Sequence, residues 1–308
     1  MEESLLKAVR SLETGVCHLY SKKFDTYTED ELLKYIKNGT DDRLFAIAQL
    51  IRLNTDLIRI YNATKIDMFF LEKFKNIVDF ENVIKENVKD IQTLKDAKKM
   101  GVSDKYIGML WGMNESEVFN LRKENNIFPV YKMIDTCASE FDSYVPYFYS
   151  TYEEENESVV SDKKKIIVLG SGPIRIGQGV EFDYSTVHAI WSIREAGYEA
   201  IIINNNPETV STDYTTSDKL YFEPLTNEDV MNVIKAENPI GVVVAFGGQT
   251  AIKLTKFLDK KGIKILGTSA ESIDIAEDRE RFDELLEKYG IFRPKGESVM
   301  TLDEALTA

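Results

Sequence analysis

Glycines and charged side chains crowd one loop in the second half of the chain, and these residue types could handle a small anion. Four glycines lie between positions 170 and 179, with Arg175, Glu181 and Asp183 beside or soon after them. A loop needs this many glycines where backbone segments approach one another, or a ligand, closely. The loop therefore either packs tightly against its surroundings or forms a polar passage or lip for an anion. Arg175 and Glu181 could also pair with one another.

The same loop fails the pattern of a dinucleotide site. That pattern needs three glycines after a strand, and an acidic residue near the end of the next strand to bind a ribose. Gly170 and Gly172 fit, but Arg175 stands in the place of the third glycine, and three asparagines at 204–206 stand where the acid should be. The Gly-Lys-Ser/Thr of a phosphate-binding loop is also absent from the sequence. An NAD-dependent oxidoreductase is therefore a disfavoured alternative.

Strands and helices alternate around this loop from residue 165 onward. The expected strands, all short apolar runs, are residues 165–169, 200–203, 241–246 and 263–266. With helical segments between them, they predict a parallel sheet covered by helices on both faces. Ligands bind such sheets at the carboxyl ends of the strands. The loops at that edge are residues 170–179, 204–213 and 247–250. The second is rich in turn-forming Asn, Thr and Ser, which favours a hydrogen-bonded loop over catalysis.

Residues 1 to about 126 have the apolar spacing of successive helices. Capping boxes, in which an oxygen-bearing side chain is followed three residues later by a carboxylate, occur at residues 28–31 and 114–117. No alternating strand pattern of useful length interrupts them. This half is expected to be an all-α domain. Its last helical pair, near residues 103–125, carries no net positive charge, which disfavours a DNA-binding helix-turn-helix.

Residues 127–164 and the last residues of the chain have a different character. The first segment is rich in Tyr and Phe, unlike a flexible linker, and is expected to run extended along a surface. At residues 301–304 another capping box begins a helix shortly before Ala308. We expect the chain to be a piece of a longer polypeptide, with a natural C-terminus at 308 as the alternative.

Composition and charge exclude several classes of protein. The formal net charge is -14, which disfavours a broad electrostatic surface for nucleic acid or anionic lipid. No apolar run approaches the ~20 residues of a membrane span, and the acidic N-terminus does not resemble a secretory signal. Cys17 and Cys137 are far apart and match no zinc-binding or disulfide spacing. A reducing, cytoplasmic location is expected.

Ordered motifs along the chain resemble the large subunit of carbamoyl phosphate synthetase. They are residues 173–184 (PIRIGQGVEFDY), 206–214 (NPETVSTDY), 247–250 (GGQT) and 276–282 (AEDRERF). Together they resemble the start of that family's second, carbamoyl-phosphate-forming half. Upstream, residues 128–138 and 149–154 resemble the connection out of its helical oligomerisation domain. Ser171 and Ile174 depart from the glycine and asparagine that are usual in the family.

The resemblance implies a multidomain fold, in which an all-α domain precedes an α/β Rossmann-like parallel-sheet domain. The implied parts are a helical oligomerisation domain at 1–126 (with 1–20 resembling the end of the first synthetase half), an aromatic-rich connector at 127–164, a pre-ATP-grasp domain at 165–268 and a truncated beginning of an ATP-grasp domain at 269–308.

It also implies an activity, that of an ATP-dependent carbon–nitrogen ligase. The family makes carbamoyl phosphate from bicarbonate, glutamine-derived ammonia and two ATP, with Mg²⁺ or Mn²⁺ and K⁺, for arginine or pyrimidine biosynthesis. A glutaminase small subunit supplies the ammonia, and carbamate travels through an internal passage between the two halves. The partners implied are that small subunit and other large subunits, the latter through a homo-oligomer of the helical domain. An interaction module without chemistry is the alternative.

Four residues take roles from the resemblance. Arg175, Gly179 and Glu181 are expected to lie along the carbamate passage, and Arg279 to point toward nucleotide at the entry of the ATP-grasp unit. No catalytic residue or metal ligand is expected, because the sequence given stops before the ATP-grasp phosphate loop and its carboxylates. Phosphoryl transfer depends on metal and charge clamps around the phosphates. Residues 1–308 alone are therefore expected to be inactive and to bind no cofactor tightly.

Overall fold

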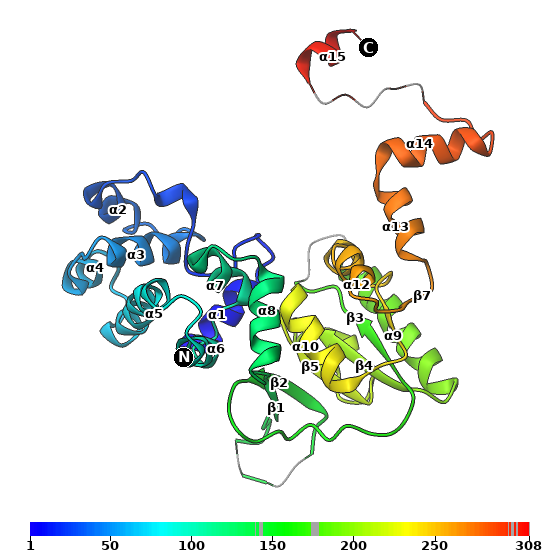
Figure 1. The fold of residues 1–308 in the computed structure, drawn as a ribbon, viewed down its shortest axis with the longest axis horizontal. Coiled ribbons are helices and arrows are strands. Elements are labelled where there is room, and N and C mark those ends of the chain that lie inside the picture. Colours follow the sequence, from blue (N-terminus) through cyan, green and yellow to red (C-terminus); the bar gives the residue numbers. More distant parts are fainter. Residues whose placement is uncertain are drawn as a thin grey trace.

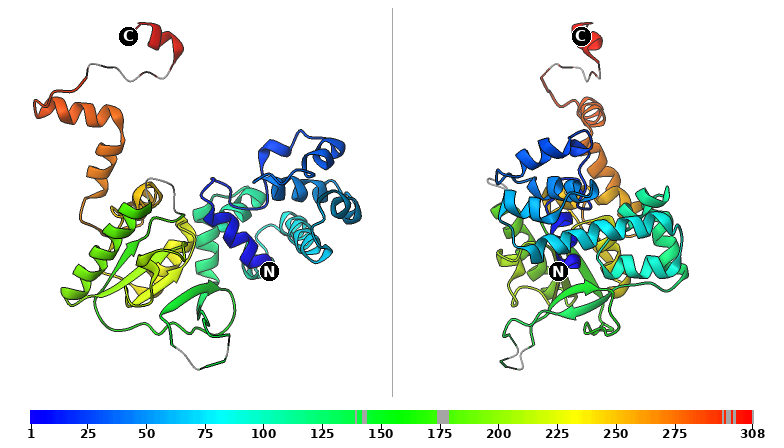
Figure 2. Two further views of the ribbon diagram at one scale, coloured as in Figure 1. Left: turned by 180° about the vertical axis from the view of Figure 1, so that it is seen from behind. Right: turned by 90° about the vertical axis from the view of Figure 1, so that its left-hand side faces the viewer.

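The computed structural model describes residues 1–138, 140–141, 144–173, 179–294, 296, 299 and 301–307. A helical half lies beside a half built on one sheet, and the C-terminal helices lead away from both (Figures 1 and 2). The multidomain expectation, all-α followed by a mostly parallel α/β unit, is confirmed. Within the described ranges, we find no helix with the length and apolar character that a membrane span requires.

Successive amphipathic helices build the first half, as the apolar spacing predicts. They are α1 (Glu2–Ser11), α2 (Glu29–Tyr35), α3 (Arg43–Arg52), α4 (Leu57–Thr64), α5 (Met68–Glu86), α6 (Ile91–Lys99), α7 (Asp104–Trp111) and α8 (Glu115–Glu124), with a 3-10 turn, η1 (Lys22–Phe24). Both expected capping boxes form, at Thr28 before α2 and at Asn114 before α8. One apolar core, including Leu6, Ile47 and Leu94, joins these helices.

The second half is organised by a sheet whose strand order is β1-β2-β5-β4-β3-β6-β7. The strands are β1 (Val130–Met133), β2 (Tyr147–Thr151), β3 (Lys165–Leu169), β4 (Glu199–Asn204), β5 (Lys219–Phe222), β6 (Gly241–Val243) and β7 (Ile265–Leu266). All neighbouring pairs are parallel except β1 and β2, which are antiparallel. Two of these strands come from the aromatic-rich connector. The connector therefore extends the sheet, where the sequence predicted a segment lying on a surface.

Helices cover both faces of the sheet, so every residue of the central strands β3 and β4 is buried, with side chains pointing alternately to the two faces. Ile201 and Ile203 of β4 face a core shared with α10 (Asn227–Glu237), α11 (Gly248–Ile252) and α12 (Thr255–Lys260). Ala200 and Ile202 face the other core, which includes Ile190 of α9 (Gly179–Glu195). The expected helix near 248–262 is thus two short helices. A further 3-10 turn, η2 (Val210–Thr212), lies in the loop after β4.

A buried ion cluster joins the amino ends of the strands to the connector. Glu237, at the end of α10, accepts hydrogen bonds from Lys165 of β3 at 2.8 Å and from Lys219 of β5 at 2.7 Å. The Tyr221 hydroxyl also donates to Glu237 and lies 2.7 Å from the hydroxyl of Ser158 in the connector. Burial alone would raise the pKa of Glu237, but its lysine and tyrosine partners outweigh burial and lower this pKa.

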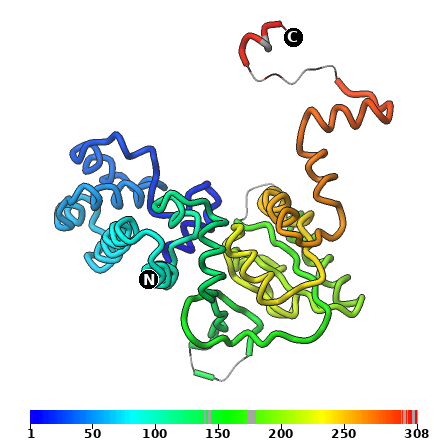
Figure 3. Tube along the Cα trace, viewed as in Figure 1, coloured from blue at the N-terminus to red at the C-terminus, as the bar shows by residue number. Residues whose placement is uncertain are grey.

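The chain beyond the sheet extends away from the rest of the molecule. It consists of α13 (Ala270–Glu277), α14 (Arg279–Lys288) and α15 (Leu302–Thr307), and the trace leaves the sheet at β7 (Figure 3). Ile273 of α13 packs on the sheet core, whereas α14 has no buried residue. This is the region in which the resemblance places the beginning of an ATP-grasp domain.

Candidate functional site at the carboxyl edge of the sheet

Loops that follow β3 and β4 meet at the carboxyl edge of the sheet. Gly170, after β3, donates its N–H to the carbonyl of Ile203 in β4 at 2.9 Å. Asn204, at the end of β4, is fully buried. Its Oδ1 accepts from the N–H of Gly172 at 3.1 Å and from that of Asn205 at 2.9 Å. One amide oxygen therefore fixes both loops, at the edge where the sequence predicts a site.

Close contacts explain the glycines that the structure describes at this edge of the sheet. We call this region, with Gly170, Gly172, Gly247 and Gly248, the glycine corner. A Cβ on Gly170 would lie 2.5 Å from Cγ of Asn204, and a Cβ on Gly247 would lie 2.5 Å from the carbonyl oxygen of Gly170. Gly248 has φ +58° and lies against the ring of Phe182, which a Cβ would meet at 2.7 Å. Tight packing, one of the two sequence interpretations, therefore accounts for the glycines at the start of the first loop and in the third loop.

The structure describes three of the four residues that the resemblance singled out. Arg175 lies outside the described residues. Gly179 is the first residue of α9, and Glu181 is exposed in its first turn. Arg279 is exposed at the start of α14, which projects away from the sheet (Figure 2). The passage and nucleotide roles of these residues stay predictions.

Asp183 connects α9 to the second loop. Its carboxylate accepts from the N–H of Val210 at 3.0 Å and from that of Ser211 at 3.1 Å. The loop at 204–213 is thus held by hydrogen bonds, as its Asn, Thr and Ser content predicts. Asp183 therefore positions the second loop against α9.

A segment of the helical half also reaches the glycine corner, a contact that the sequence analysis did not predict. Glu13, just after α1, accepts a hydrogen bond from the Thr250 hydroxyl in α11 at 2.6 Å. Its other carboxylate oxygen lies where a Cβ on Gly172 would approach it to 2.4 Å. Nothing in the local sequence around Glu13 signals this contact, because Glu13 and Thr250 are 237 positions apart.

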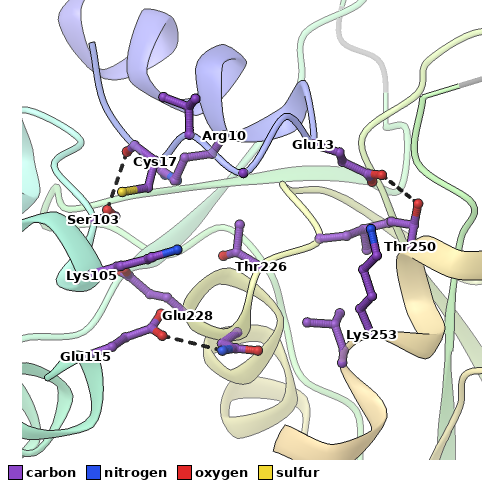
Figure 4. Close-up of a pocket in the computed structure, with 15 residues that line it drawn as sticks. Arg10, Glu13, Cys17, Ser103, Lys105, Glu115, Thr226, Glu228, Thr250 and Lys253 are labelled. Carbon is purple, nitrogen blue, oxygen red and sulfur yellow. Dashed lines mark hydrogen bonds between the residues drawn. The ribbon is translucent and has the colours of Figure 1, made fainter. Parts of the chain in front are cut away.

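The corner opens on a cleft between the two halves. The cleft has a volume of about 550 Å³ and is lined from the helical half by Arg10, Glu13 and Lys105, and from the sheet half by Thr250 and Lys253 (Figure 4). Lys105 and Lys253 are exposed and make no ion pair with any residue that the structure describes. Glu13, Glu115 and Glu228 line the same cleft, so cations and carboxylates from both halves face it.

Below the cleft, buried ion pairs join the two halves. Arg122 of α8 binds Asp104 of α7 at 2.6 Å, and Lys98 of α6 lies 3.1 Å from Asp104. Glu228 of α10 crosses from the sheet half to bind Lys98 at 2.5 Å and the N–H of Asp104 at 2.6 Å. We call these four residues the Glu228 cluster. Nearby, Arg10 donates to Asp229 at 3.3 Å. The cluster fixes the orientation of the halves around the cleft.

The Glu228 cluster predicts loss of stability in acid. Burial alone would raise the pKa of Glu228, but the attraction of Lys98 and Arg122 lowers it from 4.5 to about 2. A carboxylate whose folded-state pKa is lowered stabilises the fold above its unfolded-state pKa, and this contribution is lost as pH falls through the folded-state pKa. Through Glu228, the free energy of unfolding is therefore expected to fall as the pH drops below about 4.5. Burial raises the pKa of Asp104 in the same cluster, so protonation of Asp104 opposes part of this loss.

Urea denaturation at a series of pH values measures this effect. In Glu228→Gln the acid-dependent loss should be smaller, whereas exposed Glu72→Gln should keep the slope of the unchanged chain. Identical slopes in Glu228→Gln and the unchanged chain would contradict the prediction.

Two family models match the chain, in the order of the two halves. A model described as "Carbamoyl-phosphate synthetase large chain, oligomerisation domain" matches residues 1–126. A model described as "Carbamoyl phosphate synthase preATP-grasp domain" matches residues 162–275. The chain belongs to the carbamoyl phosphate synthetase large-chain family. The first match ends where α8 gives way to the connector, and the second contains the glycine corner. This family assignment confirms the resemblance seen in the motifs.

Solved structures similar to this synthetase-family chain include biotin carboxylases. One is the biotin carboxylase domain of a thermophilic 2-oxoglutarate carboxylase bound to ADP (18% identity, TM-score 0.31, covering 42% of this chain and 28% of that one). Another is the biotin carboxylase subunit of pyruvate carboxylase (20%, 0.32, covering 46% and 32%). A third is the biotin carboxylase domain of a single-chain bacterial carboxylase (14%, 0.34, covering 47% and 33%). The chain thus spans about a third of the length of these structures.

Proposed function

We propose that this chain is the part of a glutamine-dependent carbamoyl phosphate synthetase large chain that joins the two synthetase halves. The observation that carries the proposal is the succession, on one chain, of an oligomerisation domain and a pre-ATP-grasp domain. The complete enzyme would be an ATP-dependent ligase that forms carbamoyl phosphate from bicarbonate, glutamine-derived ammonia and ATP. In that enzyme this chain would supply subunit association and one wall of the carbamate passage.

The proposed reaction of the complete enzyme requires metal ions as well as ATP. ATP with Mg²⁺ or Mn²⁺, and K⁺, belong to the proposed reaction. Within the described ranges, no group of three His, Cys, Asp or Glu side chains is arranged to hold a metal ion. We therefore derive no phosphoryl-transfer step from this chain. We propose that residues 1–308 alone release no ADP from Mg-ATP, and such release would contradict this part.

The passage proposal concerns Arg175, Gly179 and Glu181. One observation supports it: Glu13 and Thr250, which contact one another at the corner, also line the cleft. Carbamate is a small, unstable anion, so a route enclosed by protein would limit its hydrolysis by excluding water. Gly179 is the first residue of α9 and in the sequence directly follows the glycine-rich segment.

Replacing Gly179 with Trp in the complete enzyme should uncouple ATP use from product formation. A bulky side chain there would obstruct the route, so carbamate would be lost and the ATP consumed per carbamoyl phosphate should rise about twofold or more. Steady-state assays of ADP and carbamoyl phosphate measure this ratio. Gly39→Trp is a matched control, because a Cβ at Gly39 meets only the end of Arg43 at 3.9 Å. An unchanged ratio in Gly179→Trp would count against the passage.

Self-association is the second part of the proposal, and α4 and α5 offer the surface. Ile58 and Tyr61 of α4 and Phe69 and Phe70 of α5 are large apolar side chains exposed in the single chain. The Phe69 and Phe70 rings lie 5.4 Å apart, edge to face. Both helices lie on the side of the helical half away from the sheet (Figure 1). A second copy of this chain is the occupant we propose, because this half matches an oligomerisation domain.

Sedimentation of the full 308-residue chain tests this surface. Phe69→Asp should weaken self-association about tenfold or more, since it would bury an unpaired charge between copies. Met109→Asp is the control: Met109 is also exposed but lies on α7. Unchanged association in Phe69→Asp would exclude this surface, whereas a monomeric unchanged chain at tens of micromolar would contradict self-association itself.

The remaining expectations belong to the same proposal. The resemblance implies the glutaminase small subunit as partner, a role in arginine or pyrimidine biosynthesis, and nucleotide contact by Arg279. A cytoplasmic location is proposed from the cysteine usage of the sequence. A module of the same two domains without chemistry is the alternative. A complete enzyme whose coupling is insensitive to Gly179→Trp would favour that alternative.

A further inference from the structure

The end of α1 lies against the edge of the sheet where doubly wound folds bind ligands. In the strand order, the chain runs from β3 to β4 and β5 on one side and then crosses to β6 on the other side of β3. The crevice beside β3, where the strand order reverses, is therefore the expected ligand position. Here the helical half reaches that crevice with residues 11–13. These residues contact one loop from each of β3, β4 and β6.

Three contacts define this arrangement. The Thr250 hydroxyl, after β6, donates to Glu13 Oε2 at 2.6 Å. The Asn205 side chain, after β4, donates to the carbonyl of Ser11 at 3.1 Å. Gly172, after β3, has φ +70° and no Cβ, and this leaves the space that Glu13 Oε1 approaches. The Glu13 carboxylate therefore lies between the loops after β3 and β6.

The backbone at Glu13 indicates that these side-chain contacts decide its conformation. Glu13 has φ +55°, in the left-handed region that glycine or asparagine adopts more readily. A glutamate persists in such a conformation when its surroundings determine it. The preceding helix is itself anchored to the sheet half, because Lys7 binds Glu223 at 3.1 Å and Arg10 binds Asp229 at 3.3 Å.

We propose that Glu13 is a positioning residue, which holds the loops after β3 and β6 at a fixed separation and ties that separation to the helical half. The inference deepens the passage part of the proposed function and rests on it for its consequence in the enzyme. A shift of α1 relative to the sheet would move Glu13 against Gly172 and Thr250. The separation between the loops after β3 and β6 would then change with the position of the helical half.

Hydrogen exchange of the full 308-residue chain tests the positioning role. In Glu13→Ala, exchange at residues 170–172 and 247–252, in the loops after β3 and β6, should become about tenfold faster, while β3 keeps its protection. Glu13→Gln, which keeps an acceptor for Thr250, should restore most of that protection. Thr250→Val should reproduce part of the effect. Exchange in the double variant should be no faster than in Glu13→Ala, because both substitutions remove the same hydrogen bond between Thr250 and Glu13. Glu72→Ala, an exposed glutamate of the same half, is the control.

Each outcome decides the inference. Unchanged exchange in Glu13→Ala overturns it, and so does a uniform increase that includes β3, which would indicate only general destabilisation. Additive effects of Glu13→Ala and Thr250→Val would also overturn it. In the complete enzyme, Glu13→Ala should raise the ATP consumed per carbamoyl phosphate. Faster exchange at the loops with unchanged coupling would support the positioning role and contradict the passage.

Discussion

Glu228→Ala is expected to lower the free energy of unfolding by about 3–5 kcal/mol, because it removes one partner of a buried ion cluster. Glu228 is the only member of its cluster that comes from the sheet half; Lys98, Asp104 and Arg122 come from the helical half. Its loss leaves Lys98 and Arg122 facing one carboxylate. It also removes the acceptor that the N–H of Asp104 uses at 2.6 Å. Buried charges and donors that lose a partner cannot recover it from water.

Urea denaturation followed by circular dichroism measures this loss. The free energy of unfolding of Glu228→Gln should lie between those of the alanine variant and the unchanged chain, because its amide oxygen can still accept from the N–H of Asp104. The exposed pair of Lys75 and Asp79 in α5 provides the control, since Asp79→Ala should cost less than about 0.5 kcal/mol. A cost below about 1 kcal/mol for Glu228→Ala would show that the cluster does not hold the halves together.

Glu237→Ala is expected to cost a similar amount, about 3–5 kcal/mol, at the opposite edge of the sheet. Its carboxylate accepts from two buried lysines, Lys165 and Lys219, and from the Tyr221 hydroxyl. Without it, the buried ammonium groups of Lys165 and Lys219 lose the carboxylate that they share, while Glu199 stays 3.7 Å from Lys165. This loss should loosen the amino ends of β3 and β5 and release the connector at Ser158.

Denaturation together with proteolysis separates this effect from a general one. Glu237→Ala should make the connector near residues 153–163 a preferred early cleavage site, whereas Glu228→Ala should not. Glu271→Ala, which removes an exposed partner of Arg281, should leave stability and cleavage nearly unchanged. A Glu237→Ala chain as stable as the unchanged protein would contradict the structural role of this cluster.

The sequence by itself determined the elements whose signals are local. The capping boxes at Thr28 and Asn114 form because each needs only a side chain and a backbone N–H three residues apart. β3 occupies residues 165–169, as its short apolar run predicts. The order of the helical and the parallel-sheet parts also followed, since both periodicities are readable along the chain. The ordered motifs sufficed to indicate the family.

Only the tertiary structure decided where distant segments meet. The strands β1, β2 and β5 carry weak local patterns and gain their hydrogen bonds by pairing with one another and with β4. Glu13 reaches Thr250 across 237 positions, and Lys98 reaches Glu228 across 130. A glutamate that crosses between the halves has the same local sequence pattern as one that faces water. Its role depends on which charges surround it after folding, and periodicity and spacing carry no information about that.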